Sequence, residues 1–268
     1  MKQACLYVLF LVGFQFSSFA TWSIIVADPK TKMIGIAGAS CTHSVYGIGI
    51  IAPGQGAIVV QAMSNALARL KGFEMIREGA KPAAILKQLM SPQYSPQVQQ
   101  YAILCLNEVE KPLVFTGAET NAYGGAMTGY GISAQGNTLA DSNEVKVIYE
   151  AAVKGQKDGL PLQEVLMLAL EAGARMGGDK RCGERKASSA FLIVCKPTDV
   201  AEYWLKLVVY GDDDQTPAVG ALRKKFEEWK MRPNAGVLNH SGNSDNGSVP
   251  EFVHVEFVLP KEDIECSF

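Results

Sequence analysis

The N-terminus joins two segments of opposite character, and this junction constrains the rest of the chain most strongly. Lys2 gives a positive start, and residues 4–14 are almost wholly apolar. Residues 18–20 (SFA) place small side chains at positions −3 and −1 of a cut after Ala20, the pattern that a signal peptidase reads. We therefore predict a signal peptide over residues 1–20 and an exported protein, either secreted or periplasmic.

A cut after Ala20 would make Thr21 the first residue of the mature chain. Thr21 would then carry a hydroxyl and a free α-amine on one residue. That is the minimal equipment of an N-terminal-nucleophile hydrolase, because the amine can act as base for the hydroxyl. The alternative is a membrane anchor that is never removed, but the apolar run is shorter than the about 20 residues that cross a bilayer.

Strand and helix signals occur in separate blocks along the mature chain. Residues 21–27 and 33–40 are predicted strands that form a hairpin around the turn cluster 28–32. Further strands are expected at residues 46–53, 56–62, 101–106, 112–115, 188–194, 203–210 and 252–259. Helices are expected at residues 65–78, 82–90, 142–155, 161–176 and 219–229. Such blocks predict an α+β fold in which helix layers pack on antiparallel sheets.

Two other stretches differ from these blocks in composition. Residues 116–134 are rich in glycine and short polar side chains, which is typical of backbone that lies against a site. From residue 232 the composition turns to Asn, Ser, Gly and Asp. We therefore predict one domain over residues 21–231, followed by a polar linker and C-terminal tail (232–268) with one edge strand.

Composition excludes several classes of function. Hydrophobic residues make up 48% of the chain and charged residues 19%, which fits a packed globular protein. The net charge is −2 and the basic residues are scattered, so neither nucleic acid nor a membrane surface is an expected partner. Neither a G-x-G-x-x-G nor a P-loop sequence is present, and no cofactor is expected.

Cysteine and histidine patterns give little support for a metal or redox centre. No cysteine pair has C-x-x-C spacing, and no His/Cys/Asp cluster has the spacing of metal ligands. One or two disulfides are possible, with Cys182 and Cys195 the nearest pair, whereas Cys105 and Cys195 lie in apolar runs that predict buried thiols. His43 would have to be the base of a Ser-His-Asp hydrolase, and no G-x-S-x-G elbow accompanies it.

Three polar clusters remain as candidates for a site, and each also has a structural interpretation. Gln61 ends an apolar strand, and Asn65 after it is a candidate helix N-cap. Residues 135–137 (QGN) would form a turn, and residues 177–181 (GGDKR) would cap the strongest helix.

Five segments occur in the order found in one known family: residues 21–29 (TWSIIVADP), 60–62 (VQA) with Asn65, 115–118 (FTGA), 135–140 (QGNTLA) and 169–181 (ALEAGARMGGDKR). Together they resemble the domain-of-unknown-function family 1028 (DUF1028), which is assigned to the Ntn-hydrolase superfamily. The resemblance spans about residues 21–229 and implies a four-layer αββα sandwich and an amidohydrolase without an established substrate. Residues 182–189 depart from the sequence that usually follows Gly-Gly-Asp-Arg in the family.

The catalytic hypothesis places Thr21 Oγ1 as nucleophile on an amide carbonyl. The α-amine, with a pKa of about 8, would take the proton and return it to the leaving amine. Asn137 is the first candidate to donate a hydrogen bond to the oxyanion, together with backbone N–H groups near Gly136.

The other candidate residues would hold the substrate or the nucleophile. Asn65 and Gln61 are further candidate donors, Asp179 would orient the Thr21 ammonium or a polar partner, and Arg181 would bind a substrate carboxylate in a bidentate manner. The substrate would be a small-molecule or peptide amide, and assembly into a homo-oligomer is left open. The alternative hypotheses are a catalytically silent envelope or ligand-binding module on the same fold, and a structural protein of the envelope.

Overall fold

The computed structural model describes residues 21–120, 123–200, 202–211 and 216–232. The predicted signal peptide and the predicted linker and tail, including the expected strand at 252–259, lie outside the described residues, apart from the first residue of the linker.

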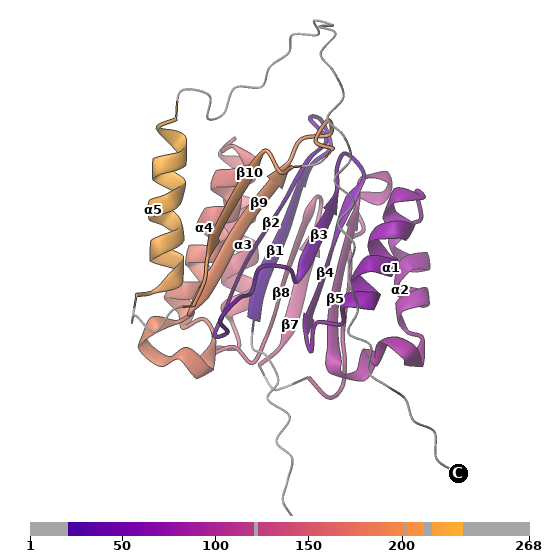
Figure 1. Cartoon of the computed structure of the whole chain (residues 1–268), viewed down its shortest axis with the longest axis horizontal. Helices are drawn as coiled ribbons and strands as arrows, with labels where there is room; N and C mark the ends of the chain where they lie inside the picture. The colour runs from indigo at the N-terminus through magenta and orange to yellow at the C-terminus, as the bar shows by residue number, and fades with distance from the viewer. Residues whose placement is uncertain (1–20, 121–122, 201, 212–215, 233–268) are drawn as a thin grey trace, which may run out of the picture. The chain divides into compact units, whose positions relative to one another are not determined.

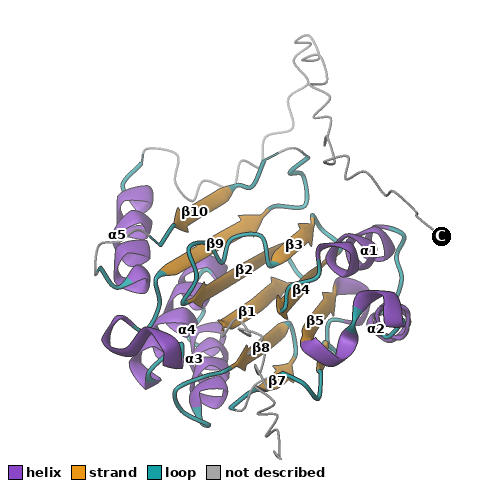
Figure 2. Cartoon of the chain, turned by 60° about the horizontal axis from the view of Figure 1, so that its bottom comes forward, coloured by secondary structure: helices purple, strands orange, loops and turns teal. Residues whose placement is uncertain are grey.

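The described strands form two antiparallel sheets. The larger sheet has six strands in the order β10-β9-β2-β1-β8-β7, visible in Figure 2. Its strands are β1 (Thr21–Asp28), β2 (Met33–Ser40), β7 (Gly125–Gly129), β8 (Ile132–Asn137), β9 (Ser189–Cys195) and β10 (Leu205–Val209). The smaller sheet has the order β3-β4-β5-β6. Its strands are β3 (Gly49–Ala52), β4 (Gly56–Ala62), β5 (Gln99–Cys105) and β6 (Leu113–Thr116).

Helices cover the outer faces of both sheets. On one side of Figure 1, α1 (Ala66–Arg77) and α2 (Pro82–Leu89) pack on the smaller sheet. On the other side, α3 (Glu144–Lys157), α4 (Leu162–Met176) and α5 (Ala218–Lys230) pack on the larger sheet. Short 3₁₀ segments cover Pro92–Tyr94, Pro96–Val98, Leu106–Glu108 and Lys180–Arg185. The result is the predicted four-layer αββα sandwich.

The alternation along β1 explains how one strand serves two layers. Ile25 and Ala27 lie in the apolar core between the sheets, together with residues such as Val59 and Leu104. Side chains of successive strand residues point to opposite faces. Trp22 therefore points to the helices, and its indole Nε1 donates to the Leu170 carbonyl of α4 at 3.2 Å.

Local signals explain where several elements begin and end. Asn65 caps α1, because its Oδ1 accepts from the Ala68 N–H at 3.0 Å. Pro82 opens α2 in the first turn, where its missing N–H costs nothing. Gly177, with φ of 125°, ends α4 in a conformation that favours glycine. Among the described helices, none is long and apolar enough to cross a membrane.

The glycine-rich stretch 116–134 departs from the expectation. It was expected to lie against a site and no strand was predicted in it, but it contains β7 and the start of β8. The turn interpretation of residues 135–137 is also wrong, because they end β8 as fully buried strand residues. Small residues and glycines mask the strand signal here because β8 is covered on both faces.

Trp22 provides a test of the layer between β1 and α4. It is fully buried, and a Cβ added at Gly173 of α4 would lie 2.6 Å from its Nε1. Trp22→Ala should lower the free energy of unfolding by about 3–5 kcal/mol, because it leaves a large cavity. Urea titration would measure this, with Val200→Ala, at a 98% exposed position, as a control within about 0.5 kcal/mol of wild type. A loss below about 1 kcal/mol for Trp22→Ala would contradict this packing.

Candidate functional site

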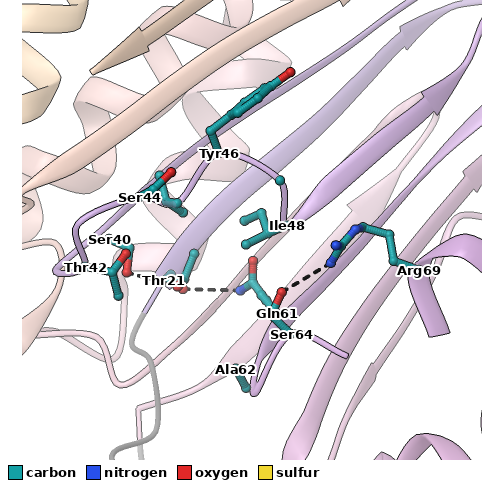
Figure 3. A pocket seen from close by; sticks show the side chains of 12 residues that line it. Thr21, Ser40, Thr42, Ser44, Tyr46, Ile48, Gln61, Ala62, Ser64 and Arg69 are labelled. Carbon is teal, nitrogen blue, oxygen red and sulfur yellow. Dashed lines mark hydrogen bonds between the residues drawn. The ribbon is translucent and has the colours of Figure 1, made fainter. Parts of the chain in front are cut away.

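A pocket of about 300 Å³ opens where the inter-sheet layer ends beside the start of β1. Its wall comes from the ends of β1, β2 and β4, the loop after β2, and helix α1 (Figure 3). The residues that line it are Thr21, Ser40, Thr42, Ser44, Val45, Tyr46, Gly47, Ile48, Gln61, Ala62, Ser64 and Arg69.

Thr21 is the first residue of β1 and lines this pocket. Its hydroxyl donates to Ser40 Oγ at 3.3 Å. Ser40 is also its register partner on β2. The pairing follows from the hairpin, since Asp28 faces Met33 at the turn and each step outward keeps the register. Register therefore sets two hydroxyls side by side at the pocket.

Gln61 ties the backbone of Thr21 to the smaller sheet. Its Nε2 donates to the Thr21 carbonyl at 3.2 Å and to Gln100 Oε1 at 2.7 Å. Its Oε1 accepts from Ser23 Oγ at 2.6 Å, and Ser23 Oγ in turn accepts from Gln135 Nε2 at 2.7 Å. Both amide atoms of this fully buried side chain are thus engaged, so Gln61 positions Thr21 and has no donor left for an oxyanion.

Gln100 extends the same network across the two sheets. From β5, its Nε2 lies 3.0 Å from the Gly136 carbonyl of β8, 3.2 Å from the Gly125 carbonyl of β7 and 2.9 Å from Thr116 Oγ1. Gly136, a predicted substrate-binding residue, does not line the pocket. Its carbonyl contributes to the fastening of the sheets instead.

Asn137 lies beside Thr21 and behind the pocket wall. It is the register partner of Thr21 on β8, so both side chains lie on the same face of the sheet. It is fully buried and is not among the lining residues. Its Nδ2 donates weakly to Gln100 Oε1 at 3.4 Å, and its Oδ1 has no hydrogen-bond partner among the described residues. The amide therefore retains hydrogen-bonding capacity next to Thr21.

Two residues of the pocket wall have unusual backbone conformations. Ala62 has φ of 69° and Ser64 has φ of 51°, both in the left-handed region that non-glycine residues rarely adopt. Such strain persists where the surrounding structure imposes it, and it is concentrated at functional sites. The segment after β4 is therefore held in a fixed shape beside Thr21.

Arg69 is the single charged side chain among the described residues that line the pocket. It extends from α1 toward the pocket, and its guanidinium donates to Ser64 Oγ at 3.3 Å (Figure 3). Burial lowers its pKa. Among the described residues no carboxylate pairs with it. Sequence reasoning missed Arg69, because it stands inside a helical pattern like any surface arginine.

Arg181, the residue predicted to bind substrate, is bound to Asp179 instead. Its Nε donates to Asp179 Oδ1 at 3.0 Å and its Nη2 to Asp179 Oδ2 at 2.7 Å. Asp179 is fully buried, so its carboxylate needs this compensation. Neither residue lines the pocket, and the direct contact predicted between Asp179 and Thr21 is absent from the described interactions.

Asp179 affects the pocket indirectly, because it binds the backbone of the loop that follows β2. Its Oδ2 accepts from the Cys41 N–H at 2.6 Å. Cys41 also forms a disulfide with Cys182, with the two Cα atoms 5.4 Å apart. One of the possible disulfides is therefore present, between Cys182 and Cys41 and not between the pair nearest in sequence, and the prediction that Cys105 and Cys195 are buried thiols is confirmed. Disulfide and carboxylate together fix the backbone next to Ser40.

The remaining candidates have structural roles or none in the pocket. Asn65 caps α1 and does not line the pocket, so its predicted role as a donor to substrate is not supported by its position. His43 contacts the Gly211 carbonyl through Nδ1 at 2.6 Å. Among the described residues, no group of His, Cys, Asp and Glu could hold a metal ion.

Glu144 is a buried carboxyl close to the Asp179 region. It lies in the first turn of α3, and neither carboxylate oxygen has a hydrogen-bond partner among the described residues. Burial raises the pKa of Glu144 to about 8, with Asp141 and Asp179 adding to the effect and the Gly178 backbone opposing it. Glu144 is therefore protonated at neutral pH in the folded protein.

This raised pKa predicts a loss of stability with rising pH. The folded state keeps the Glu144 proton up to about pH 8, whereas the ordinary value is 4.5. The stabilising effect is complete below about pH 4.5 and is lost toward pH 8, by at most about 1.4 kcal/mol per pH unit. Urea titrations at several pH values should show a smaller decline for Glu144→Gln than for wild type. The exposed control Glu228→Gln should keep the wild-type slope, and an unchanged slope in Glu144→Gln would contradict the assignment.

The disulfide predicts a reductant-sensitive stability. Its two cysteines are 141 residues apart in the sequence, so it restricts a long loop in the unfolded chain. Reduction should lower the free energy of unfolding by about 2–5 kcal/mol. A variant with both Cys41→Ser and Cys182→Ser should match the reduced protein and should not respond to reductant. Equal stability before and after reduction, with the freed thiols counted by reagent, would exclude a stabilising role.

Comparisons with known proteins agree with this architecture. Residues 21–220 match the model of a family described as a family of unknown function, DUF1028. A crystal structure of a DUF1028 protein from Silicibacter pomeroyi is similar to this chain, with a TM-score of 0.68 and 24% identity. The match covers 81% of this chain and 92% of that one, which shows a shared fold. No curated protein matches the sequence. On the family match, which covers most of its length, the chain belongs to the DUF1028 family.

Proposed function

We propose that the protein is an N-terminal-nucleophile amidohydrolase in which Thr21 attacks an amide carbonyl. One observation carries the proposal: the residue that a signal peptidase would expose is also the residue whose hydroxyl lines the pocket. The family match begins at the same residue, which supports a mature chain that starts there.

The reaction needs only groups that the mature chain would supply, together with water. Thr21 Oγ1 forms a bond to the amide carbon, and its proton moves to the α-amine, directly or through one water molecule. The carbon–nitrogen bond then breaks, and the amine leaves with that proton. Water attacks the resulting ester, releases the carboxylic acid and restores the threonine hydroxyl. The Ser40 hydroxyl, which accepts from Thr21 Oγ1, would orient the nucleophile.

The geometry of β1 supports a well-placed α-amine. Ala27 donates its N–H to the Gly131 carbonyl, and the backbone groups of alternate residues in a strand point toward the same neighbour. Thr21 therefore turns its backbone toward β8, where its partner is Asn137. We assign the unpartnered Asn137 Oδ1 as an acceptor for the Thr21 ammonium, the role that Asp179 was predicted to fill.

Stabilisation of the oxyanion is assigned to the other end of the same amide, a role that requires this side chain, which lies behind the pocket wall, to turn toward the pocket when substrate binds. Asn137 Nδ2 makes one weak hydrogen bond, so one of its N–H groups is available. A single preorganised donor of this kind is typically worth about 2.7–4 kcal/mol of transition-state stabilisation.

Export is the second part of the proposal. The mature amine exists only after cleavage, because the uncut chain has an amide nitrogen at Thr21 without basicity. The Cys41–Cys182 disulfide supports an oxidising compartment, since disulfides persist in secreted and periplasmic proteins.

The proposal predicts the start of the mature chain and the effect of removing its hydroxyl. Mass spectrometry of protein expressed from the full sequence should give a chain that begins at Thr21. Thr21→Ala should lower hydrolysis of any amide substrate found in a screen by at least about 10³-fold, because the nucleophile is lost. Thr21→Ser, which keeps a hydroxyl and an α-amine, should retain measurable turnover and should be labelled by electrophiles that capture N-terminal hydroxyl residues.

Two outcomes would contradict this function. A mature chain that starts at Trp22, or that keeps residues 1–20 in the exported protein, would remove the catalytic amine. Equal turnover by Thr21→Ala and wild type would remove the nucleophile. Ligand binding without turnover by the correctly processed chain would favour the ligand-binding module.

A further inference from the structure

Among the described residues, Arg69 has no carboxylate partner, and none of those that line its pocket is acidic. Arg69 is only partly exposed, and its polar contact is with the neutral Ser64 hydroxyl. None of the other described residues that line the pocket is acidic: they are the hydroxyl residues, Gln61, Gly47 and the aliphatic Ala62, Val45 and Ile48. A partly buried guanidinium loses hydration, and one hydrogen bond to the neutral Ser64 hydroxyl replaces only part of it.

Other arginines of the chain show what a structural role looks like here. Arg181 is bound to Asp179, and Arg223 is bound to Glu164, Glu171 and Glu227. Both guanidinium groups are neutralised by carboxylates of the same fold. Arg69 differs in that its environment supplies no such partner among the described residues.

We propose that Arg69 binds a carboxylate of the substrate, so that the pocket takes small amides that carry a free carboxylate. This inference rests on the proposed function for the amide, with the reacting carbonyl at Thr21 and the carboxylate at Arg69. Guanidinium and carboxylate match in bidentate geometry. The Ser64 hydroxyl accepts from the guanidinium at 3.3 Å and donates its own proton to the Val60 carbonyl at 3.0 Å, so Arg69 itself supplies the donors to the carboxylate.

Charge and size favour a carboxylate on a small molecule. One guanidinium neutralises one carboxylate, whereas phosphate groups are commonly bound by clusters of arginines. The volume of about 300 Å³ is at the lower end for ligand pockets, which run to roughly 1,000 Å³. A folded protein substrate does not fit such a site.

The test compares acids with their neutral counterparts on the mature protein. N-acetyl amino acids and the corresponding N-acetyl amino acid amides differ in one terminal group. Calorimetric titration would use Thr21→Ala, so that turnover does not disturb binding. The acids should bind about 10- to 100-fold more tightly than the amides, as expected for a charge-assisted contact. Arg69→Gln should reduce that ratio to about one, and Arg69→Lys should retain part of it.

Arg77→Gln is the matched control, because it removes a guanidinium from the same helix at a residue that does not line the pocket. It should keep the full preference for acids. Melting temperatures would show whether each variant folds. If Arg69→Gln does not fold, the ratio of acid to amide affinity in the Arg69-containing protein still shows whether the pocket prefers a carboxylate.

Failure of this inference is distinguishable from failure of the proposed function. Selective binding of acids without hydrolysis by the Thr21-containing protein would support the anion site and contradict the hydrolase. Hydrolysis of amides with no preference for acids would support the hydrolase and contradict the anion site. Equal affinity for acids and amides, no binding of either, or a preference that survives Arg69→Gln would overturn the role of Arg69.

Discussion

Two buried glutamines hold the sheets together where apolar packing stops. Gln61 and Gln100 lie on neighbouring strands of the smaller sheet, and both bond to backbone carbonyls of the larger one. A buried amide left without partners costs about 1–3 kcal/mol, so each glutamine favours the one sheet arrangement that satisfies it. Because Gln61 bonds to the Thr21 carbonyl itself, the constraint that fixes the sheets also fixes the candidate nucleophile.

The charged residues near the polar end of the inter-sheet layer have two different roles. Asp179 and Arg181 neutralise each other and, with the disulfide, hold the backbone next to Ser40. Both side chains are engaged in holding the structure around the site, and neither lines the pocket. Arg69 lies across the pocket on α1, and no carboxylate of the described residues pairs with it. A site for an anionic ligand requires a rigid surrounding structure and a cationic side chain that is not already paired with a carboxylate.

The sequence predicts the layers better than the pocket, for reasons that particular residues show. The hairpin 21–40 has a clear turn cluster, so its register and the pairing of Thr21 with Ser40 follow from counting outward. Residues 135–137 look like a turn in the sequence because their composition is polar and small. Gln100, thirty-five or more residues earlier in the chain, donates to the Gly136 carbonyl and accepts from Asn137 Nδ2, and a local pattern cannot show these contacts. Asp179 and Arg181 lie in one polar cluster of the sequence but were predicted to have separate roles at the site, and only the structure shows that they bind each other. Arg69 gives no local signal, since its role depends on the absence of a carboxylate nearby in space.

If the protein is exported and cleaved as proposed, the order of these events determines when the site becomes active. Before cleavage, the nitrogen of Thr21 belongs to a peptide bond and cannot accept a proton at neutral pH. Gln61 holds the carbonyl of Thr21 and Ser40 contacts its hydroxyl, and neither of these two contacts involves that nitrogen. The pocket can therefore form fully in a precursor without a base. On the proposed mechanism, removal of the signal peptide changes the chemistry of one atom and leaves the surrounding hydrogen bonds in place, so activation requires no rearrangement of the fold.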